Sequence, residues 1–204
     1  DKKQLLKEIS TKQENYFTAD NAQKEKLNLE IRNLKLDILT KQLELMIENK
    51  GFKSDSMQGL NKKQIAAWQQ TQDWKKALND LKTLKKNPKQ DFNHFDWKLD
   101  FPEVLNPLVN EITGFDIVIA NHPYLGEKGN KEKFHEVKKG FLKDWYQSKM
   151  DLFYFFFHLS ITLSKKDSII SFITTNYFIT ADGALKLRND FKTRTSPIQL
   201  INFN

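Results

Sequence analysis

The chain contains no cysteine, which excludes disulfide bonds, thiolate metal sites and cysteine nucleophiles. It also lacks any run of about 18 consecutive apolar residues, so no membrane-spanning segment is expected. The chain opens on Asp1, Lys2 and Lys3, and no apolar run follows, so no secretory signal is expected. We therefore expect a cytoplasmic protein with no membrane partner. Hydrophobic residues make up 39% of the chain, enough for a buried core.

Glycine and proline are scarce at the start of the chain, where the first glycine is Gly51 and the first proline is Pro88. Such a stretch, rich in lysine, glutamine, leucine and glutamate, is typical of long helices. Two adjacent apolar stripes run along residues 22–50, and a second periodic segment runs from about Asn61 to Lys86. With residues 51–59 as a turn, residues 1–90 are predicted to form a coiled-coil-like helical hairpin.

Positive charge is concentrated in the same part of the chain. Residues 1–90 hold 19 Lys/Arg against 12 Asp/Glu, whereas residues 91–204 hold 14 of each. The basic face of the hairpin is either a solvated surface or a contact surface for phosphate. A second group of lysines, better placed for contacts to a nucleic-acid backbone, lies in a polar segment: Lys128, Lys131, Lys133, Lys138, Lys139 and Lys143.

Residues 91–204 have the pattern of an α/β domain. Residues 115–120 and 168–173 are short apolar runs that predict buried strands, and residues 198–203 predict a third strand. Helices are expected at 152–163 and 184–193. Residues 125–150 are expected to be a mobile loop with short helical pieces. Alternation of strands and helices predicts a parallel sheet, whose ligands bind beyond the carboxyl ends of its strands.

Polar residues follow two of these strands and are the candidate site. Asn121, His122, Pro123 and Tyr124 come directly after the first strand, and Asn176 follows the second. Asp151 precedes the apolar helix, where it either caps the first turn or lies near a cofactor. His94, His135 and His158 are isolated, and the spacing of His, Asp and Glu predicts no metal site.

The order and spacing of these segments resemble the adenine-specific DNA methyltransferases of the class I, S-adenosylmethionine-dependent fold. More narrowly, they resemble the methyltransferase part of type IIG restriction–modification enzymes. The family signature is a strand that begins Phe-Asp and ends in Asn-Pro-Pro-Tyr, matched here by Phe115–Ala120 followed by Asn121–Tyr124. The lead-in Phe95–Val104, the helix start Asp151–Phe153 and the segment Ser171–Phe178 also match, in the same order.

The resemblance implies methyl transfer from S-adenosylmethionine to the exocyclic amino group of an adenine flipped out of double-stranded DNA. It assigns a side-chain acceptor to Asn121 and a backbone acceptor to residue 122, with Tyr124 stacking on the base. Pro123 stiffens the turn. Asn176 is a candidate substrate contact, and Asp151 a candidate cofactor contact.

The chain departs from the family pattern at two places. His122 occupies the position of the first proline, and no glycine-rich cofactor loop is found after a strand. We therefore expect a partial class I (Rossmann-like) core in residues 91–204, preceded by a helical insertion. Its partners would be cofactor-binding, target-recognition and nuclease regions of a parent polypeptide, and the fragment alone would be inactive. The alternatives are an impaired DNA-binding or scaffolding module with the same fold, and a coiled-coil interaction protein.

Overall fold

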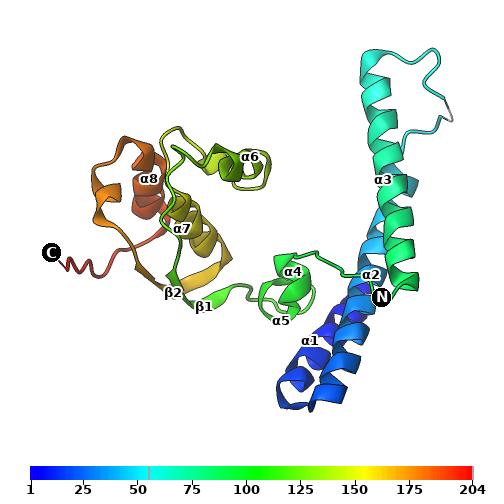
Figure 1. The fold of residues 1–204 in the computed structure, drawn as a ribbon, viewed down its shortest axis with the longest axis horizontal. Helices are drawn as coiled ribbons and strands as arrows, with labels where there is room; N and C mark the ends of the chain where they lie inside the picture. The colour runs from blue at the N-terminus through cyan, green and yellow to red at the C-terminus, as the bar shows by residue number, and fades with distance from the viewer. Residues whose placement is uncertain (55, 204) are drawn as a thin grey trace. The chain divides into compact units, whose positions relative to one another are not determined.

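The computed structural model describes residues 1–54 and 56–203. The chain divides into two compact units, Asp1–Glu111 and Ile112–Asn204, each of which is described by itself. Helices dominate the first unit, and the second combines helices with a small sheet (Figure 1).

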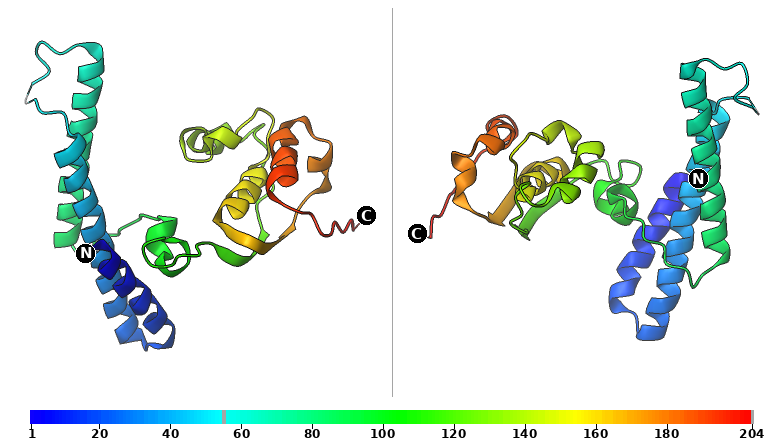
Figure 2. Two further views of the ribbon diagram at one scale, coloured as in Figure 1. Left: turned by 180° about the vertical axis from the view of Figure 1, so that it is seen from behind. Right: turned by 45° about the horizontal axis from the view of Figure 1, so that its top comes forward.

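The first unit is built on three long helices, α1 (Lys2–Thr18), α2 (Asn21–Lys50) and α3 (Lys62–Lys86). Two short helices follow, α4 (Trp97–Asp100) and α5 (Pro102–Leu105). Helices α2 and α3 form the predicted hairpin and run side by side (Figures 1 and 2). They are antiparallel, because Glu44 pairs with Lys82 at 2.8 Å while the earlier Asp37 pairs with the later Lys85.

Both arms of the hairpin begin at a capping box, which explains where the helices start. The Asp20 carboxylate accepts a hydrogen bond from the backbone N–H of Gln23 at 2.9 Å, and the Gln23 side chain accepts one from the Asp20 N–H. Asn61 and Gln64 repeat this exchange at the start of α3. Each box satisfies N–H groups that a helix start otherwise leaves without a partner.

Helix α1 was not anticipated from the sequence. Its fully buried Leu6 and Ile9 pack against Ile31 and Ile38 of α2. The wide apolar face of α2 is thereby shared between two partner helices, α1 and α3. Periodicity showed that this face was wide, but not how many helices cover it, because both outcomes require the same stripe.

The second unit contains two parallel strands, β1 (Phe115–Asn121) and β2 (Ser164–Ile173). The regular ladder pairs Ile117 with Ile169 and continues to Asn121 opposite Ile173. Between the strands lie α6 (Lys131–Lys139), η1 (Lys143–Trp145) and α7 (Leu152–Leu163). After β2 come η2 (Asn176–Ile179), η3 (Asp182–Ala184) and α8 (Leu185–Arg194). The parallel strand–helix–strand unit confirms the predicted α/β class.

The prediction of fully buried strands was wrong. Residues alternate along both strands, and Ile119 and Ile173 are 77% and 64% exposed. The more protected positions face α7, where Phe172 of β2 meets Phe157 at 4.4 Å between ring centroids. Within the described residues, helix α7 therefore covers one face of the two-stranded sheet, and the other face carries exposed isoleucines.

The third predicted strand was also wrong. Residues 198–203 have no regular secondary structure, and Ile198 and Phe203 are 90% and 89% exposed (the end of the ribbon in Figures 1 and 2). An apolar, β-branched run becomes a strand only when a neighbouring strand accepts its backbone hydrogen bonds. The described residues 112–197 offer this run no paired strand.

The core of the second unit lies between α6, α7 and α8. Its buried members are largely aromatic: Phe134, Met150, Phe153, Tyr154, Phe155, Phe178, Ala184 and Leu187. This core anchors the first turns of α7, and so fixes the helix that packs beneath the ends of β1 and β2. Across the described chain, every helix is too short or too polar to traverse a lipid bilayer.

Candidate functional site

The two candidate segments leave the sheet at the same edge. Asn121 is the last residue of β1 and is paired in register with Ile173, the last residue of β2. Residues 122–124 and 174–177 therefore emerge side by side, as expected for two parallel strands. This places the tetrapeptide and Asn176 on one end of the α/β unit.

Asn121 and Tyr124 lie next to each other and are both exposed to solvent. The Tyr124 hydroxyl donates a hydrogen bond of 2.9 Å to the backbone carbonyl of Ile173. It also lies 3.4 Å from Asn121 Oδ1, which accepts a longer hydrogen bond. The phenol thus links the tetrapeptide to the end of β2 and orients the Asn121 carboxamide, while 46% of Tyr124 remains accessible.

His122 points in the opposite direction, into the protein, and is only 3% exposed. Its ring is stacked on Phe153 of α7, with centroids 5.0 Å apart and planes 8° from parallel. Phe172 of β2 meets the imidazole edge-on at 5.3 Å. Burial lowers the pKa of His122, because the charged imidazolium loses its hydration in these surroundings. Pro123, between the buried and the exposed residue, is exposed.

The segment after β2 reaches the same aromatic group. Asn176 is exposed and begins η2, and the ring of the next residue, Tyr177, contacts Phe153 edge-on at 6.1 Å. Phe153 therefore lies between His122 of one segment and Tyr177 of the other. The structure brings the two predicted segments together, with Asn176 on their solvent side.

Asp151 lies at the N-terminus of α7, but its carboxylate makes no capping hydrogen bond to the described first turn. Of the two roles that the sequence left open for Asp151, capping of the first turn is therefore not observed. Its backbone instead forms an antiparallel bridge with Gly126, so that the start of α7 is tied to the loop after the tetrapeptide. Burial raises the pKa of Tyr177 to about 12, and the nearby Asp151 carboxylate adds to this rise. Asp151 is thus a buried carboxylate facing a neutral phenol.

Asp151 and Gly126–Gly129 do not by themselves form a site for S-adenosylmethionine. Gly126–Gly129 follows the tetrapeptide rather than a strand, and a side chain at Gly126 would lie 3.2 Å from Asp151 Oδ1. The Gly126 position is thus packed against Asp151 instead of opening a cradle for a nucleotide. The buried Asp151 carboxylate could accept a hydrogen bond from one polar group of the cofactor, but a single such contact does not make a cofactor site.

A charged cluster that sequence reasoning missed ties α7 to α8. His158 Nδ1 lies 2.6 Å from Asp190 Oδ2, and both side chains are buried. Arg194 donates from Nη2 to the same carboxylate at 2.6 Å, and its guanidinium lies 4.7 Å from the Trp145 ring. Burial opposes ionisation of Asp190, but hydrogen bonds from Arg194 and His158 lower its pKa. Only the four-residue spacing of Asp190 and Arg194 was visible in the sequence.

Glu127 organises the loop that follows the tetrapeptide. Its carboxylate accepts hydrogen bonds from the Tyr146 hydroxyl at 2.6 Å, from Lys138 at 3.0 Å and from the Lys149 N–H at 3.0 Å. Lys138, one of the lysines predicted to contact a nucleic-acid backbone, is therefore paired with Glu127. The other five are exposed: Lys128, Lys131, Lys133, Lys139 and Lys143.

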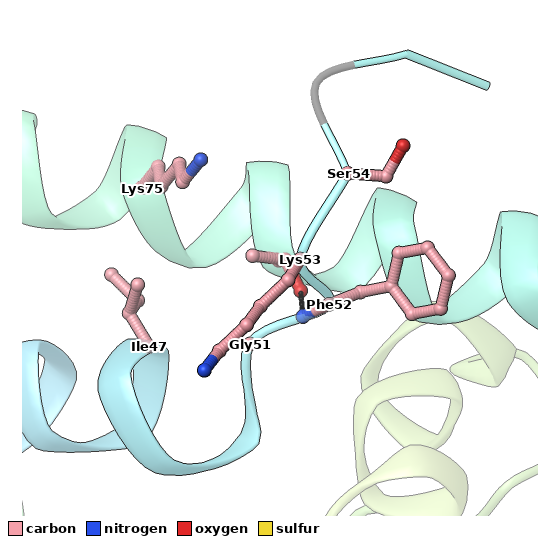
Figure 3. Close-up of a pocket in the computed structure, with 7 residues that line it drawn as sticks. Ile47, Gly51, Phe52, Lys53, Ser54 and Lys75 are labelled. Carbon is pink, nitrogen blue, oxygen red and sulfur yellow. Dashed lines mark hydrogen bonds between the residues drawn. The ribbon is translucent and has the colours of Figure 1, made fainter.

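The first unit has a pocket of its own, of 340 Å³, where α2 ends and the chain turns towards α3 (Figure 3). It is lined by Ile47, Gly51, Phe52, Lys53, Ser54, Thr71 and Lys75. The Phe52 N–H donates to the Thr71 hydroxyl at 2.9 Å, which holds the turn closed against α3. Lys53 and Lys75 extend in different directions in Figure 3, so they do not converge on one ligand. Among the described residues, no cluster of three His, Asp or Glu could hold a metal ion.

Comparison with known proteins finds a family match. The family model described as "Eco57I restriction-modification methylase" matches residues 7–204, nearly the whole chain. No curated protein matches the chain. The match spans both units, so it includes the helical hairpin as well as the α/β part that carries the tetrapeptide.

Proposed function

The chain belongs to the Eco57I restriction-modification methylase family, and on that premise we propose that it transfers a methyl group from S-adenosylmethionine to the exocyclic amino group of a flipped adenine. Family membership places it among the DNA methyltransferases of restriction–modification systems. The proposal adds the adenine target, base flipping and a type IIG-like organisation. One observation supports it most: Asn121 and Tyr124 are exposed and in contact at the carboxyl end of β1.

The chemistry requires hydrogen-bond acceptors rather than a strong base. The adenine amino nitrogen is a poor nucleophile, because its lone pair is delocalised into the ring. Two acceptors directed at its hydrogens favour the pyramidal nitrogen and stabilise the positive charge that develops during attack. We assign these acceptors to Asn121 Oδ1 and the backbone carbonyl of His122. Asn121 Oδ1 has two lone pairs, so it can accept from the base while it accepts from Tyr124.

Tyr124 is suited to hold the base once it leaves the duplex. Extrusion costs a few kcal/mol, and stacking on an aromatic ring returns about 1–3 kcal/mol per base. The ring is held edge-on by His122 at 5.4 Å and by Phe153 at 6.3 Å, and its hydroxyl is held by Ile173. A ring constrained on three sides and 46% exposed loses little further freedom when a base stacks on it.

The cofactor, when bound, supplies the methyl group, and we assign its glycine-rich binding loop to residues outside these 204. Within the chain we assign one contact to it, the buried carboxylate of Asp151, and we assign Asn176 to the substrate side. The exposed lysines of residues 128–143 are the proposed phosphate contacts, since they surround the loop that follows the tetrapeptide.

The test measures transfer of labelled methyl groups to duplex DNA by the polypeptide that carries this chain together with its cofactor loop. Asn121→Ala is expected to lower kcat by about 10²-fold or more, because it removes an acceptor used in the transition state. The matched control is Asn189→Ala, an exposed residue of α8, which is expected to leave kcat unchanged. Nucleoside analysis of the product identifies the target. Label on cytosine, or unchanged transfer by Asn121→Ala, would refute the proposal.

A second candidate is a catalytically impaired module that keeps the fold and binds DNA. His122 at the position of the family's first proline favours it, because the turn then lacks one φ restraint. DNA binding without methyl transfer by the same cofactor-competent polypeptide would support this candidate. Measurable transfer to adenine by the unmodified protein would exclude it.

A further inference from the structure

His122 is the buried member of an otherwise exposed tetrapeptide. Asn121, Pro123 and Tyr124 face solvent, whereas the imidazole is 3% exposed. Five aromatic rings surround it, which we call the aromatic shell: Tyr124, Phe153, Phe156, Phe157 and Phe172. The shell includes residues of α7, of β2 and of the tetrapeptide itself. The imidazole therefore attaches the tetrapeptide to the core, in addition to the contacts that Tyr124 makes with Ile173 and Phe153.

Neither imidazole nitrogen of His122 has a hydrogen-bond partner among the described residues. In a neutral imidazole this leaves one N–H and one nitrogen lone pair unpaired, which costs less than a buried charge, and the ring stacks on Phe153 as another aromatic ring would. An imidazolium would place a buried charge where the shell provides only ring faces and edges. Attraction between the cation and these rings is smaller than the hydration that a buried, unpaired charge loses. The direction of the pKa shift of His122, downward through burial, agrees with this balance.

We propose that the neutral imidazole of His122 is a positioning residue: seated in the aromatic shell it holds Asn121 and Tyr124 in register with the end of β2, and protonation releases the tetrapeptide. In place of the rigid ring of a proline, the chain uses a side chain anchored in the core. The turn therefore depends on pH. This inference rests on the proposed function, because what it positions are the groups assigned to the substrate base.

The surroundings contain no charge that reverses this direction. From the tetrapeptide, the titratable group facing His122 is the Tyr124 phenol, whose hydroxyl is turned to Ile173. From α7, the contacts are Phe153, Phe156 and Phe157, and from β2 the contact is Phe172. No neighbouring charge contributes to the lowered pKa of His122. Protonation is thus expected below the ordinary value of about 6.5 and is coupled to exit from the shell.

The first measurement follows the imidazole itself in the whole polypeptide with labelled histidine. Nuclear Overhauser contacts from His122 to Phe153 and Phe172 are expected at about pH 8 and are expected to disappear as the pH falls and the imidazole becomes protonated. Because burial lowers its pKa, His122 should titrate below the ordinary histidine value of about 6.5. Contacts that persist after the imidazole is protonated would overturn the proposal, whatever the activity of the protein.

The second measurement is the pH profile of kcat/KM for methyl transfer. In the unmodified protein, kcat/KM is expected to fall about tenfold per pH unit below the apparent pKa of His122, and we call this part of the profile the acid limb. His122→Phe keeps an aromatic ring in the shell but cannot be protonated, so its profile is expected to lose this acid limb, whatever its plateau. His135→Phe, on the exposed face of α6, is the matched control and should retain the limb.

The two measurements separate the two ways of being wrong. An unchanged acid limb in His122→Phe overturns the positioning role, while activity above about pH 7 leaves the proposed function intact. Absence of methyl transfer at every pH, with the shell contacts present, contradicts the proposed function and this inference with it. If His122→Phe does not fold, the titration and contacts of the unmodified protein still decide whether the shell releases the imidazole.

Discussion

The hydroxyl of Tyr124 donates a 2.9 Å hydrogen bond to the backbone carbonyl of Ile173, the last residue of β2. A residue three positions beyond the end of β1 is thereby attached to the end of the neighbouring strand. The bond limits how far the tetrapeptide can move from the sheet and keeps the Tyr124 ring beside Asn121. The hydrogen bond therefore joins the ends of β1 and β2 in one local structure.

Replacing Tyr124 by phenylalanine tests this link. Tyr124→Phe keeps the ring but removes the hydroxyl, so we expect base stacking to survive and the free energy of unfolding to fall by about 1 kcal/mol. Tyr124→Ala removes the ring as well and should weaken base binding further, by about 1–3 kcal/mol. Urea denaturation measures the first effect, and fluorescence of 2-aminopurine placed at the target base measures the second. Equal base binding by the two variants would contradict a stacking role.

Removal of the Asp190 charge is expected to destabilise the second unit strongly. Asp190→Asn leaves Arg194 without its carboxylate and breaks the buried pair with His158, at a cost of about 3 kcal/mol. Urea denaturation followed by circular dichroism gives the value. The control is Asp116→Asn, which breaks the surface pair with Lys165 and should produce no change beyond the measurement error. If both substitutions changed the free energy of unfolding equally, burial of the α7–α8 cluster would contribute nothing to stability.

The stability of the second unit is expected to fall as the pH drops below about 6.5. Burial lowers the pKa of His158, so below the unfolded value of about 6.5 the unfolded chain binds a proton that the folded chain refuses. The free energy of unfolding then decreases by up to about 1.4 kcal/mol per pH unit for each such histidine, and His122 acts in the same direction. Because the pKa of Asp190 is lowered in the folded state, protonation of this carboxylate reduces the free energy of unfolding further below about pH 4.

His158→Asn tests this pH dependence, since it removes one titrating group from the buried cluster. Between about pH 6.5 and 4, the dependence of the free energy of unfolding on pH should become shallower by up to about 1.4 kcal/mol per pH unit, which is the contribution of one proton. The control Asn189→Ala, at an exposed residue of α8 that does not titrate, should leave the slope unchanged. A slope that is the same in His158→Asn as in the unmodified protein would mean that His158 accepts its proton in the folded state.

Gly183 is required for close packing rather than for an unusual backbone angle. A Cβ at this position would lie 1.9 Å from the carbonyl oxygen of Lys149, so Gly183→Ala is expected to cost about 2 kcal/mol or more. At Gly140 the nearest described atom would be 3.4 Å away, an ordinary contact. Gly140→Ala is therefore the control and should be close to neutral. Thermal denaturation of the two variants compares them directly, and equal melting temperatures would rule out the clash.

Much of the local structure could be predicted from the sequence. The scarcity of glycine and proline before Gly51, together with apolar periodicity, indicated the two long helices, and Asp20 and Asn61 begin them as capping residues. The apolar runs at 115–120 and 168–173 indicated the two strands. Parallel pairing then placed residues 121–124 and 174–177 at one edge, since both strands end there.

The predictions that failed concern partners rather than local preference. Residues 198–203 have the composition of a strand, yet no described strand pairs with them. Asp151 stands at the start of α7 but does not cap it, and its carboxylate lies beside the Tyr177 phenol instead. Residues 198–203 and Asp151 both have the local preference for the structure that was predicted. Whether the strand or the cap forms depended on which groups lie next to them in the fold.

Periodicity and β-branching in the sequence were enough to locate α2, α3, β1 and β2 and the residues that follow each strand, because these preferences act over a few neighbouring residues. The tertiary structure was needed to show that His122 turns inward while Asn121 and Tyr124 turn outward. It alone joined His158 to Asp190, 32 positions apart in the chain. Such contacts arise from the packing of α7 against the sheet and α8, and packing brings together side chains whose distance in the sequence carries no signal.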